Sequence, residues 1–208
     1  QDACANAGAE DCDDVDADGI CDDVDDCVGA YDECGVCNGD NACLCDAGDA
    51  NGDGSVNVTD IVAMVNVILG GDAELTECAD VNGDGSLNVT DIVAAVSIIL
   101  GDGRGADASS AKVIKTADAV TLKADGFIGA VQMTLNHGKN FSIDLTDKAM
   151  VSEYRTSGNH TTLIVVVPEG EELFTYSGEF EIADIMVVNG SDAINVVKPA
   201  VFTLGAVY

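Results

Sequence analysis

Apolar residues recur at helical spacing in two stretches of nearly identical sequence. They follow an i, i+4, i+7, i+8 pattern at Ile61, Val65, Ile68 and Leu69, and again 31 residues later at Ile92, Val96, Ile99 and Leu100. This spacing predicts two amphipathic helices, which Gly70 and Gly101 are expected to end. Met64 and Ala95 fall outside the apolar stripe, so we expect them to be accessible to a partner.

After residue 110 the pattern changes to short β-rich runs separated by turn residues. Val131, Met133 and Leu135 alternate with polar residues, as in a strand with one buried face. We predict strands near 111–116, 119–124, 128–136, 140–145, 161–167, 179–188, 193–197 and 200–207. Eight short strands in about 100 residues favour a β-sandwich over 111–208, and the Gly-rich stretch 102–110 has the composition of a linker.

Each predicted helix follows a loop rich in Asp, Asn and Gly. Oxygen-bearing side chains stand at positions 1, 3, 5, 9 and 12 of the loop, Gly stands at position 6, and position 7 offers its backbone carbonyl. Calcium requires this arrangement because it takes six to eight oxygen ligands, and we expect position 12 to begin each helix. The predicted ligands are Asp49, Asn51, Asp53, Ser55, Asn57 and Asp60 in the first loop, and Asp80, Asn82, Asp84, Ser86, Asn88 and Asp91 in the second.

Two other interpretations fit the loops less well. Solvated turns would not explain two complete ligand sets at identical spacing. Mg²⁺ is disfavoured because it prefers octahedral sites that keep several waters. Calcium therefore remains the predicted metal.

Residues 49–101 resemble the type I dockerin, a calcium-dependent docking module, in their paired loop-plus-helix halves, the D-x-N-x-D-G loops and Asp at position 12. The resemblance implies protein partners and paired loops that lie side by side, so a disulfide from Cys78 to Cys43 or Cys45 is favoured. Dockerins of this type usually have Ser or Thr at positions 10 and 11 and basic residues some five positions further on. Here those places hold Val58, Thr59, Val65 and Asn66 in the first copy and Val89, Thr90, Val96 and Ser97 in the second. A partner must therefore make apolar contacts, or the helices are buried inside the same molecule.

Residues 1–46 are rich in Cys and Asp and contain few large apolar side chains, so disulfides and metal must stabilise them. The calcium-loop template fits once more, with Asp14, Asp16, Asp18, Ile20, Asp22 and Asp25 as ligands, Ile20 through its carbonyl. Asp16 to Cys27 also resemble a thrombospondin type 3 repeat, an extracellular calcium-wrapped spacer. An acidic disordered tail is the alternative.

All nine cysteines lie between Cys4 and Cys78. Structural disulfides explain them better than zinc, whose ligand pairs are usually a dozen or more residues apart, or a redox pair, which needs a βαβ context. An odd number leaves at least one thiol free or bonded to another chain. Disulfides predict an extracellular or cell-surface protein, and the absence of an apolar leader before Gln1 favours a processed form.

The charge distribution excludes some partners. Residues 1–103 carry 25 Asp and Glu and no Lys or Arg, whereas residues 104–208 carry 13 Asp and Glu against all 8 Lys and Arg. Such an acidic part repels nucleic acid and anionic membranes, and no apolar run is long enough to span a membrane. Five N-x-S/T sequons, at Asn57, Asn88, Asn140, Asn159 and Asn189, permit glycosylation where the machinery exists. Asn57 and Asn88 are discounted because they are predicted calcium-loop residues.

The fold class that follows is multi-domain: a calcium- and disulfide-stabilised segment (1–46), a dockerin-like α module of two loop-helix repeats (47–101), a linker (102–110) and an all-β sandwich (111–208). The runs GAVQMTLNHG and FEIADIMVVNG, with an apolar strand ending at Pro168 between them, resemble a cohesin-like or immunoglobulin-like sandwich. The uncharged run 200–208 is either the last strand of this sandwich or a strand added to a neighbour's open edge.

We predict a protein that is not an enzyme, because its two histidines, His137 and His160, stand in polar turns without a recognisable catalytic motif. The favoured function is a calcium-stabilised extracellular assembly subunit that forms homo-oligomers or polymers through non-catalytic contacts. The alternative is the C-terminal attachment module of a larger secreted protein, docking onto a separate cohesin-like scaffold.

Overall fold

The computed structural model describes residues 13–18, 20–31, 37–38, 45–101 and 105–199, arranged in two compact units, 1–45 and 46–208. In the described part of the chain no helix is both long and apolar enough to cross a membrane.

The first unit contains few large apolar side chains and is linked internally by a disulfide. Cys27 and Cys37 are bonded with their Cα atoms 5.3 Å apart, and Tyr31 forms an isolated antiparallel bridge with Cys37. Cys21, Cys45 and Cys78 are also disulfide-bonded. The predicted use of cysteine in disulfides is thus confirmed for these residues. The bridge from Cys78 to Cys43 or Cys45 stays a prediction, because Cys43 lies outside the described residues.

The second unit begins with the two predicted helices, α1 (Val58–Ile68) and α2 (Val89–Leu100). Both start at loop position 10 rather than at position 12, so the predicted start was two residues late. The cause is a capping box at the start of each helix. The Asn57 and Asn88 side chains cap the helices, and the carboxylates of Asp60 and Asp91, three residues after the cap residue, accept the backbone N–H of that residue.

Nine strands follow the helices in the described part of the second unit. They are β1 (Ser110–Lys115), β2 (Ala119–Ala124), β3 (Ala130–His137), β4 (Ser142–Leu145), β5 (Ala149–Ser157), β6 (His160–Pro168), β7 (Glu172–Ser177), β8 (Phe180–Val188) and β9 (Asn195–Val197). Seven predicted strands are confirmed to within a few residues, and the eighth, 200–207, lies outside the described residues. β5 and β7 were not predicted. The sequence cue for β5 was the two-residue turn Gly158–Asn159 between it and β6. In the structure Gly158 adopts φ 62°, as such a turn requires.

The strands form the predicted β-sandwich. One sheet has the order β4-β7-β2-β1-β9 and the other has the order β5-β6-β3-β8. Between them lies the main core, to which the second sheet contributes a row of three fully buried valines, Val165, Val131 and Val187 on neighbouring strands.

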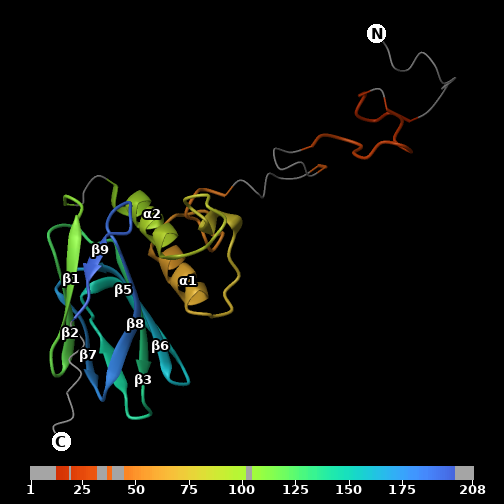
Figure 1. The fold of residues 1–208 in the computed structure, drawn as a ribbon. Coiled ribbons are helices and arrows are strands. Elements are labelled where there is room, and N and C mark those ends of the chain that lie inside the picture. Colours follow the sequence, from red (N-terminus) through yellow and green to blue (C-terminus); the bar gives the residue numbers. More distant parts are fainter. Residues whose placement is uncertain (1–12, 19, 32–36, 39–44, 102–104, 200–208) are drawn as a thin grey trace, which may run out of the picture. The chain divides into compact units, whose positions relative to one another are not determined.

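The helices pack on the other face of the β5-β6-β3-β8 sheet, as Figure 1 shows. Ile61, Met64, Val65, Ile92, Ala95 and Val96 form one buried cluster with Val151, Ile164 and Val166 of the sheet. Strand β6 is therefore covered on both faces, which explains its continuous apolar run, Leu163 to Val167.

This packing corrects the expectation that Met64 and Ala95 are accessible to a partner, because both are fully buried. It also decides an alternative that the sequence left open: the inner faces of the helices are buried inside the same molecule. Leu100, predicted to lie on the buried stripe, is instead exposed.

Helix α2 packs closely against the sheet at Gly129 and Ala130. A Cβ atom on Gly129 would lie 2.8 Å from Val93 Cγ1, so a glycine is required for this approach. Val89 and Val93 form a small buried cluster with Ala130 and Val188. The Ser97 hydroxyl donates to the carbonyls of Val93 and Gly190, at 2.9 and 3.2 Å. The second repeat is thus attached directly to the sandwich.

Candidate functional site

The carboxylate at loop position 12 is held at the base of each loop. Asp60 accepts the backbone N–H groups of Asn51 and Asn57 at 3.0 and 2.8 Å, one on each oxygen. Asp91 accepts those of Asn82 and Asn88 at 3.2 and 2.9 Å. Both carboxylates are fully buried. Each oxygen retains lone-pair capacity for a cation.

The first three ligand positions form a tight turn around the same region. In the first loop, Asp49 accepts the N–H groups of Asp53 and Gly54, at 3.1 and 3.0 Å. Asn51 Oδ1 accepts the Asp53 N–H at 2.8 Å, and Asp53 Oδ1 accepts the Ser55 N–H at 3.0 Å. These bonds recur in the second loop, 31 residues later, at 2.8 to 3.1 Å. The two loops therefore have the same local geometry.

Position 9 serves mainly as a helix cap. Asn57 Oδ1 accepts both the backbone N–H and the hydroxyl of Thr59 at 2.9 Å, while its Nδ2 donates to the Ser55 carbonyl at 3.1 Å. Asn88 makes the same bonds to Thr90 and Ser86. Because the side-chain oxygen of each asparagine already accepts two hydrogen bonds, contact with a cation through water fits better than direct ligation. Water-mediated contact is common at this loop position.

The first loop lies beside the start of the second repeat. The Thr76 hydroxyl donates to the Asp49 carbonyl at 2.7 Å, and the Thr76 backbone N–H donates to the Ala50 carbonyl at 2.9 Å. The Gly48 N–H donates to the Cys78 carbonyl at 2.9 Å. These bonds hold the entrance of the first loop against the segment that leads into the second.

The residues present fit a bound cation. Asp49 and Asp60 are buried carboxylates in one loop, and among the described residues no Lys or Arg forms an ion pair with either. Buried carboxylates without a counter-charge are costly, and two backbone N–H groups offset only part of that cost. A set of carboxylate, amide and carbonyl oxygens matches a hard divalent cation.

The N-terminal loop brings three predicted ligands together. One oxygen from each of Asp14, Asp16 and Asp18 lies within 4.8 Å of the others. Asp22 Oδ1 instead accepts the Val15 N–H at 3.0 Å, and Asp25 Oδ1 accepts the Cys27 N–H at 2.9 Å. The other oxygen of Asp25 is buried without a hydrogen-bond partner among the described residues. The Ile20 N–H donates to Asp18 at 2.8 Å. The loop is therefore closed by its own acidic side chains.

The two repeats differ in the exposure of equivalent helix residues. We call Val58, Thr59, Val62 and Asn66 of α1 the docking stripe; all four are exposed, Val58 by 43% and Val62 by 46%. Their counterparts in α2 are Val89, Thr90, Val93 and Ser97. Val89 and Val93 are buried against the sandwich, and the other two are half-buried. Of the remaining positions singled out by the dockerin resemblance, Val65 and Val96 are also buried. The first repeat thus presents a surface that the second does not.

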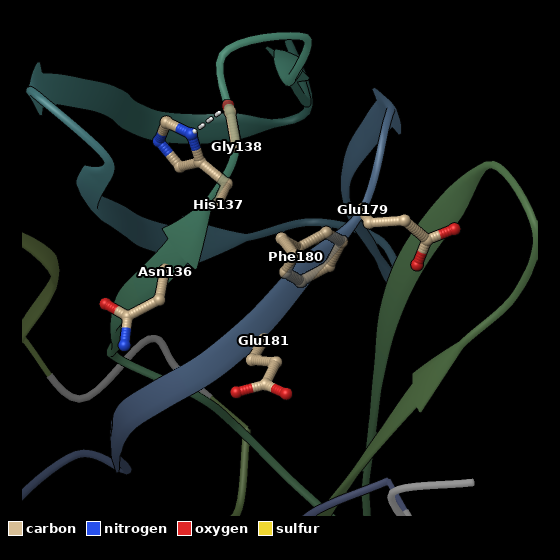
Figure 2. Close-up of a pocket in the computed structure, with 6 residues that line it drawn as sticks. All are labelled: Asn136, His137, Gly138, Glu179, Phe180 and Glu181. Carbon is tan, nitrogen blue, oxygen red and sulfur yellow. Dashed lines mark hydrogen bonds between the residues drawn. The ribbon is translucent and has the colours of Figure 1, made fainter. Parts of the chain in front are cut away.

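A pocket of about 360 Å³ lies at the end of β3 and the start of β8, lined by Asn136, His137, Gly138, Glu179, Phe180 and Glu181. The His137 ring bonds to the Gly138 carbonyl through Nδ1 at 2.9 Å and to the Thr161 hydroxyl through Nε2 at 2.8 Å. Because a carbonyl only accepts, Nδ1 carries the proton. In Figure 2 the carboxylates of Glu179 and Glu181 lie apart from each other and from this ring. The pocket therefore does not bring an acid–base pair together.

Comparisons with known proteins support the interpretation of the repeats. Residues 47–96, about a quarter of the chain, match the family described as Dockerin type I domain. A search of curated proteins gives no match. Among solved structures, the chain is similar to a non-cellulosomal cohesin from the hyperthermophilic archaeon Archaeoglobus fulgidus, at 12% identity and a TM-score of 0.29, over 46% of this chain and 86% of that chain.

The family match confirms the predicted dockerin type I resemblance for residues 47–96. Dockerin type I domains are non-catalytic modules that bind calcium and assemble proteins, so calcium and protein partners are supported in general. The predicted fold class is confirmed by the two helices, the disulfides and the two sheets of the sandwich.

Proposed function

We propose that this protein is a calcium-stabilised extracellular assembly subunit that binds protein partners through non-catalytic contacts and associates with further copies of itself. The observation that carries the proposal is the exposed docking stripe of α1 in a module whose second repeat is occupied by the chain's own sandwich. The disulfides and the dockerin match support an extracellular location.

Calcium is proposed to bind both dockerin loops through the predicted side chains, with Asn57 and Asn88 acting through water. Asp60 and Asp91 connect metal binding to the helices, because the same carboxylates bond to the cap residues from which α1 and α2 begin. Metal binding would thus stabilise the loop and the helix together. At free calcium about 100 times the dissociation constant, each site adds roughly 2.7 kcal/mol to stability.

A third calcium is proposed at Asp14, Asp16 and Asp18, with Asp22 and Asp25 closing the loop. The clustered carboxylates support it. In a segment with few apolar side chains, metal and disulfides replace a core.

The docking stripe is proposed to bind its partner by apolar contact. It carries two exposed valines and two uncharged polar side chains, and neither helix has a Lys or Arg. A carboxylate placed in such a contact would be buried unpaired, at a cost of several kcal/mol, which removes a micromolar interaction.

The test compares wild type with the double variant Val58→Asp/Val62→Asp by light scattering and negative-stain microscopy in millimolar calcium and after chelation. We expect calcium-dependent particles of wild type and folded, calcium-loaded monomers of the variant. Val197→Asp adds a carboxylate at an exposed valine of β9, outside the module and outside the proposed calcium loops, and should assemble like wild type. Assembly of the double variant at wild-type level would refute the docking stripe.

The dockerin match also supports the alternative, an attachment module that docks onto a separate scaffold. In that case wild type stays monomeric at high concentration in calcium and captures a foreign cohesin-like sandwich, and the double variant loses that capture. A wild type that neither assembles nor captures such a sandwich would contradict both functions.

A further inference from the structure

The structure separates the five glycosylation sequons into two groups. Asn57 and Asn88 cannot carry a glycan in the folded chain, because both atoms of each side-chain amide hold the calcium loop and the helix cap. Asn189 is equally engaged: its Nδ2 donates to the Ala108 carbonyl at 2.9 Å, and its Oδ1 accepts the N–H groups of Ser191 and Asp192 at 2.8 Å. A glycan on any of the three would break these bonds.

Asn140 and Asn159 are exposed, and among the described residues neither side-chain amide has a hydrogen-bond partner. Asn140 stands in the turn between β3 and β4, and Asn159 is the second residue of the two-residue turn between β5 and β6. Both are turn residues, so a bulky substituent would extend into solvent without displacing a core side chain.

The two turns lie at the same end of the sandwich. The His137 N–H donates to the Asn159 carbonyl at 2.9 Å, and His137 is three residues before Asn140. Helix α2 packs at the opposite end of β3, around Ala130. Glycans at Asn140 and Asn159 would therefore stand away from the attachment of the second repeat to the sheet.

We propose that Asn140 and Asn159 are N-glycosylation sites. The glycosyl donor is a lipid-linked oligosaccharide: the bond between C1 of its first sugar and the phosphate oxygen breaks, a bond between C1 and Asn Nδ2 forms, and the amide loses one proton. The lipid phosphate or diphosphate is the leaving group, and nothing is oxidised or reduced. The inference rests on the proposed extracellular location, because this transfer accompanies export.

The hydroxyl residues of the two sequons differ in exposure. Ser142 is exposed and bonds to the Ser177 hydroxyl at 2.8 Å. Thr161 is fully buried and bonds to His137 and Thr156. A transferase must contact this hydroxyl to recognise the sequon, so Asn159 is modified before β6 packs, whereas the Asn140 sequon keeps its hydroxyl exposed after folding.

The experiment is site-resolved mass spectrometry of the full chain secreted from a host that carries out N-glycosylation, beside a known glycoprotein as a positive control. Wild type should carry glycans at Asn140 and Asn159. The single variants Asn140→Gln and Asn159→Gln should each carry one glycan, and the double variant should carry none. Ser142→Ala removes the first sequon while leaving its asparagine and should abolish that glycan, whereas Ser142→Thr should retain it. Calcium content and circular dichroism of each variant verify the fold.

A secreted, calcium-loaded chain without a glycan at Asn140 or at Asn159, in a host that modifies the control protein, overturns the proposal for that residue. A glycan at Asn57, Asn88 or Asn189 in the folded chain would show that hydrogen bonding of the side-chain amide does not prevent glycosylation, and would overturn the reason for choosing Asn140 and Asn159. Failure of the chain to be secreted in folded form counts instead against the extracellular function on which the inference rests.

Discussion

Met64 provides the sharpest test of how the dockerin repeats and the sandwich are joined. Its side chain is fully buried in the cluster that contains Val65 and Ile92 of the helices and Ile164 and Val166 of β6. Truncation of a buried methionine to alanine costs 2–5 kcal/mol, because apolar contacts are lost and a cavity remains. We therefore expect Met64→Ala to lower the free energy of unfolding by about 3 kcal/mol, which corresponds to a melting temperature lower by roughly 6–12 °C for a unit of this size.

Val62→Ala is the matched control. Val62 lies on the same helix, two residues away, but is 46% exposed, so its truncation should change stability by no more than about 0.5 kcal/mol. Urea unfolding in saturating calcium, followed by far-UV circular dichroism and by tyrosine fluorescence in this tryptophan-free chain, measures both variants. Equal effects of the two substitutions would refute the burial of Met64.

A double-mutant cycle tests the contact itself. If helix and sheet share one cluster, Met64→Ala and Val166→Ala should be non-additive by 0.5 kcal/mol or more. Val187→Ala, on the opposite face of the same sheet, should be additive with Met64→Ala. Additivity of both pairs would mean that the helices do not pack on β6 in solution.

Three further predictions concern metal and protons. Asp53→Ala, Asp84→Ala and Asp18→Ala should each remove one calcium equivalent by calorimetry, and two sites in the intact chain would contradict the N-terminal loop. Chelation should speed amide exchange in residues 49–100 and also in β6, whose outer face the helices cover; unchanged exchange in β6 would show that the two parts are uncoupled. Hydrogen bonds from the Ser109 hydroxyl and from the backbone of Ser110 and Ser109 lower the pKa of Asp125 from 3.8 to about 2. The stability that the ionised Asp125 carboxylate contributes is therefore present above pH 3.8 and is lost as the pH falls through 2. Carboxyl NMR should find this midpoint, and Ser109→Ala should raise it.

Local features of the fold could be predicted from the sequence because their causes are local. The hydrogen-bonded loops before the helices depend on residue types at fixed spacing, and the helices follow from apolar periodicity and glycine stops. The capping boxes also lie within four residues, from Asn57 to Asp60 and from Asn88 to Asp91, so the earlier helix start was available from sequence. Strand β5 was missed because its second half is polar and exposed, which weakens the alternation that marks a strand.

What covers each helix could not be predicted from the sequence. Val58 and Val89 occupy the same place in two repeats of nearly identical sequence, yet the first is exposed and the second is buried against Ala130 and Val188. Periodicity identifies an apolar face but not the surface that covers it, because that surface comes from strands 40 to 100 residues further along the chain. The one hint was the unbroken apolar run of β6, which signals a strand covered on both sides. The sequence alone therefore determined the two loop-helix repeats and the class of the sandwich, whereas the tertiary structure decided which repeat keeps this helix face exposed.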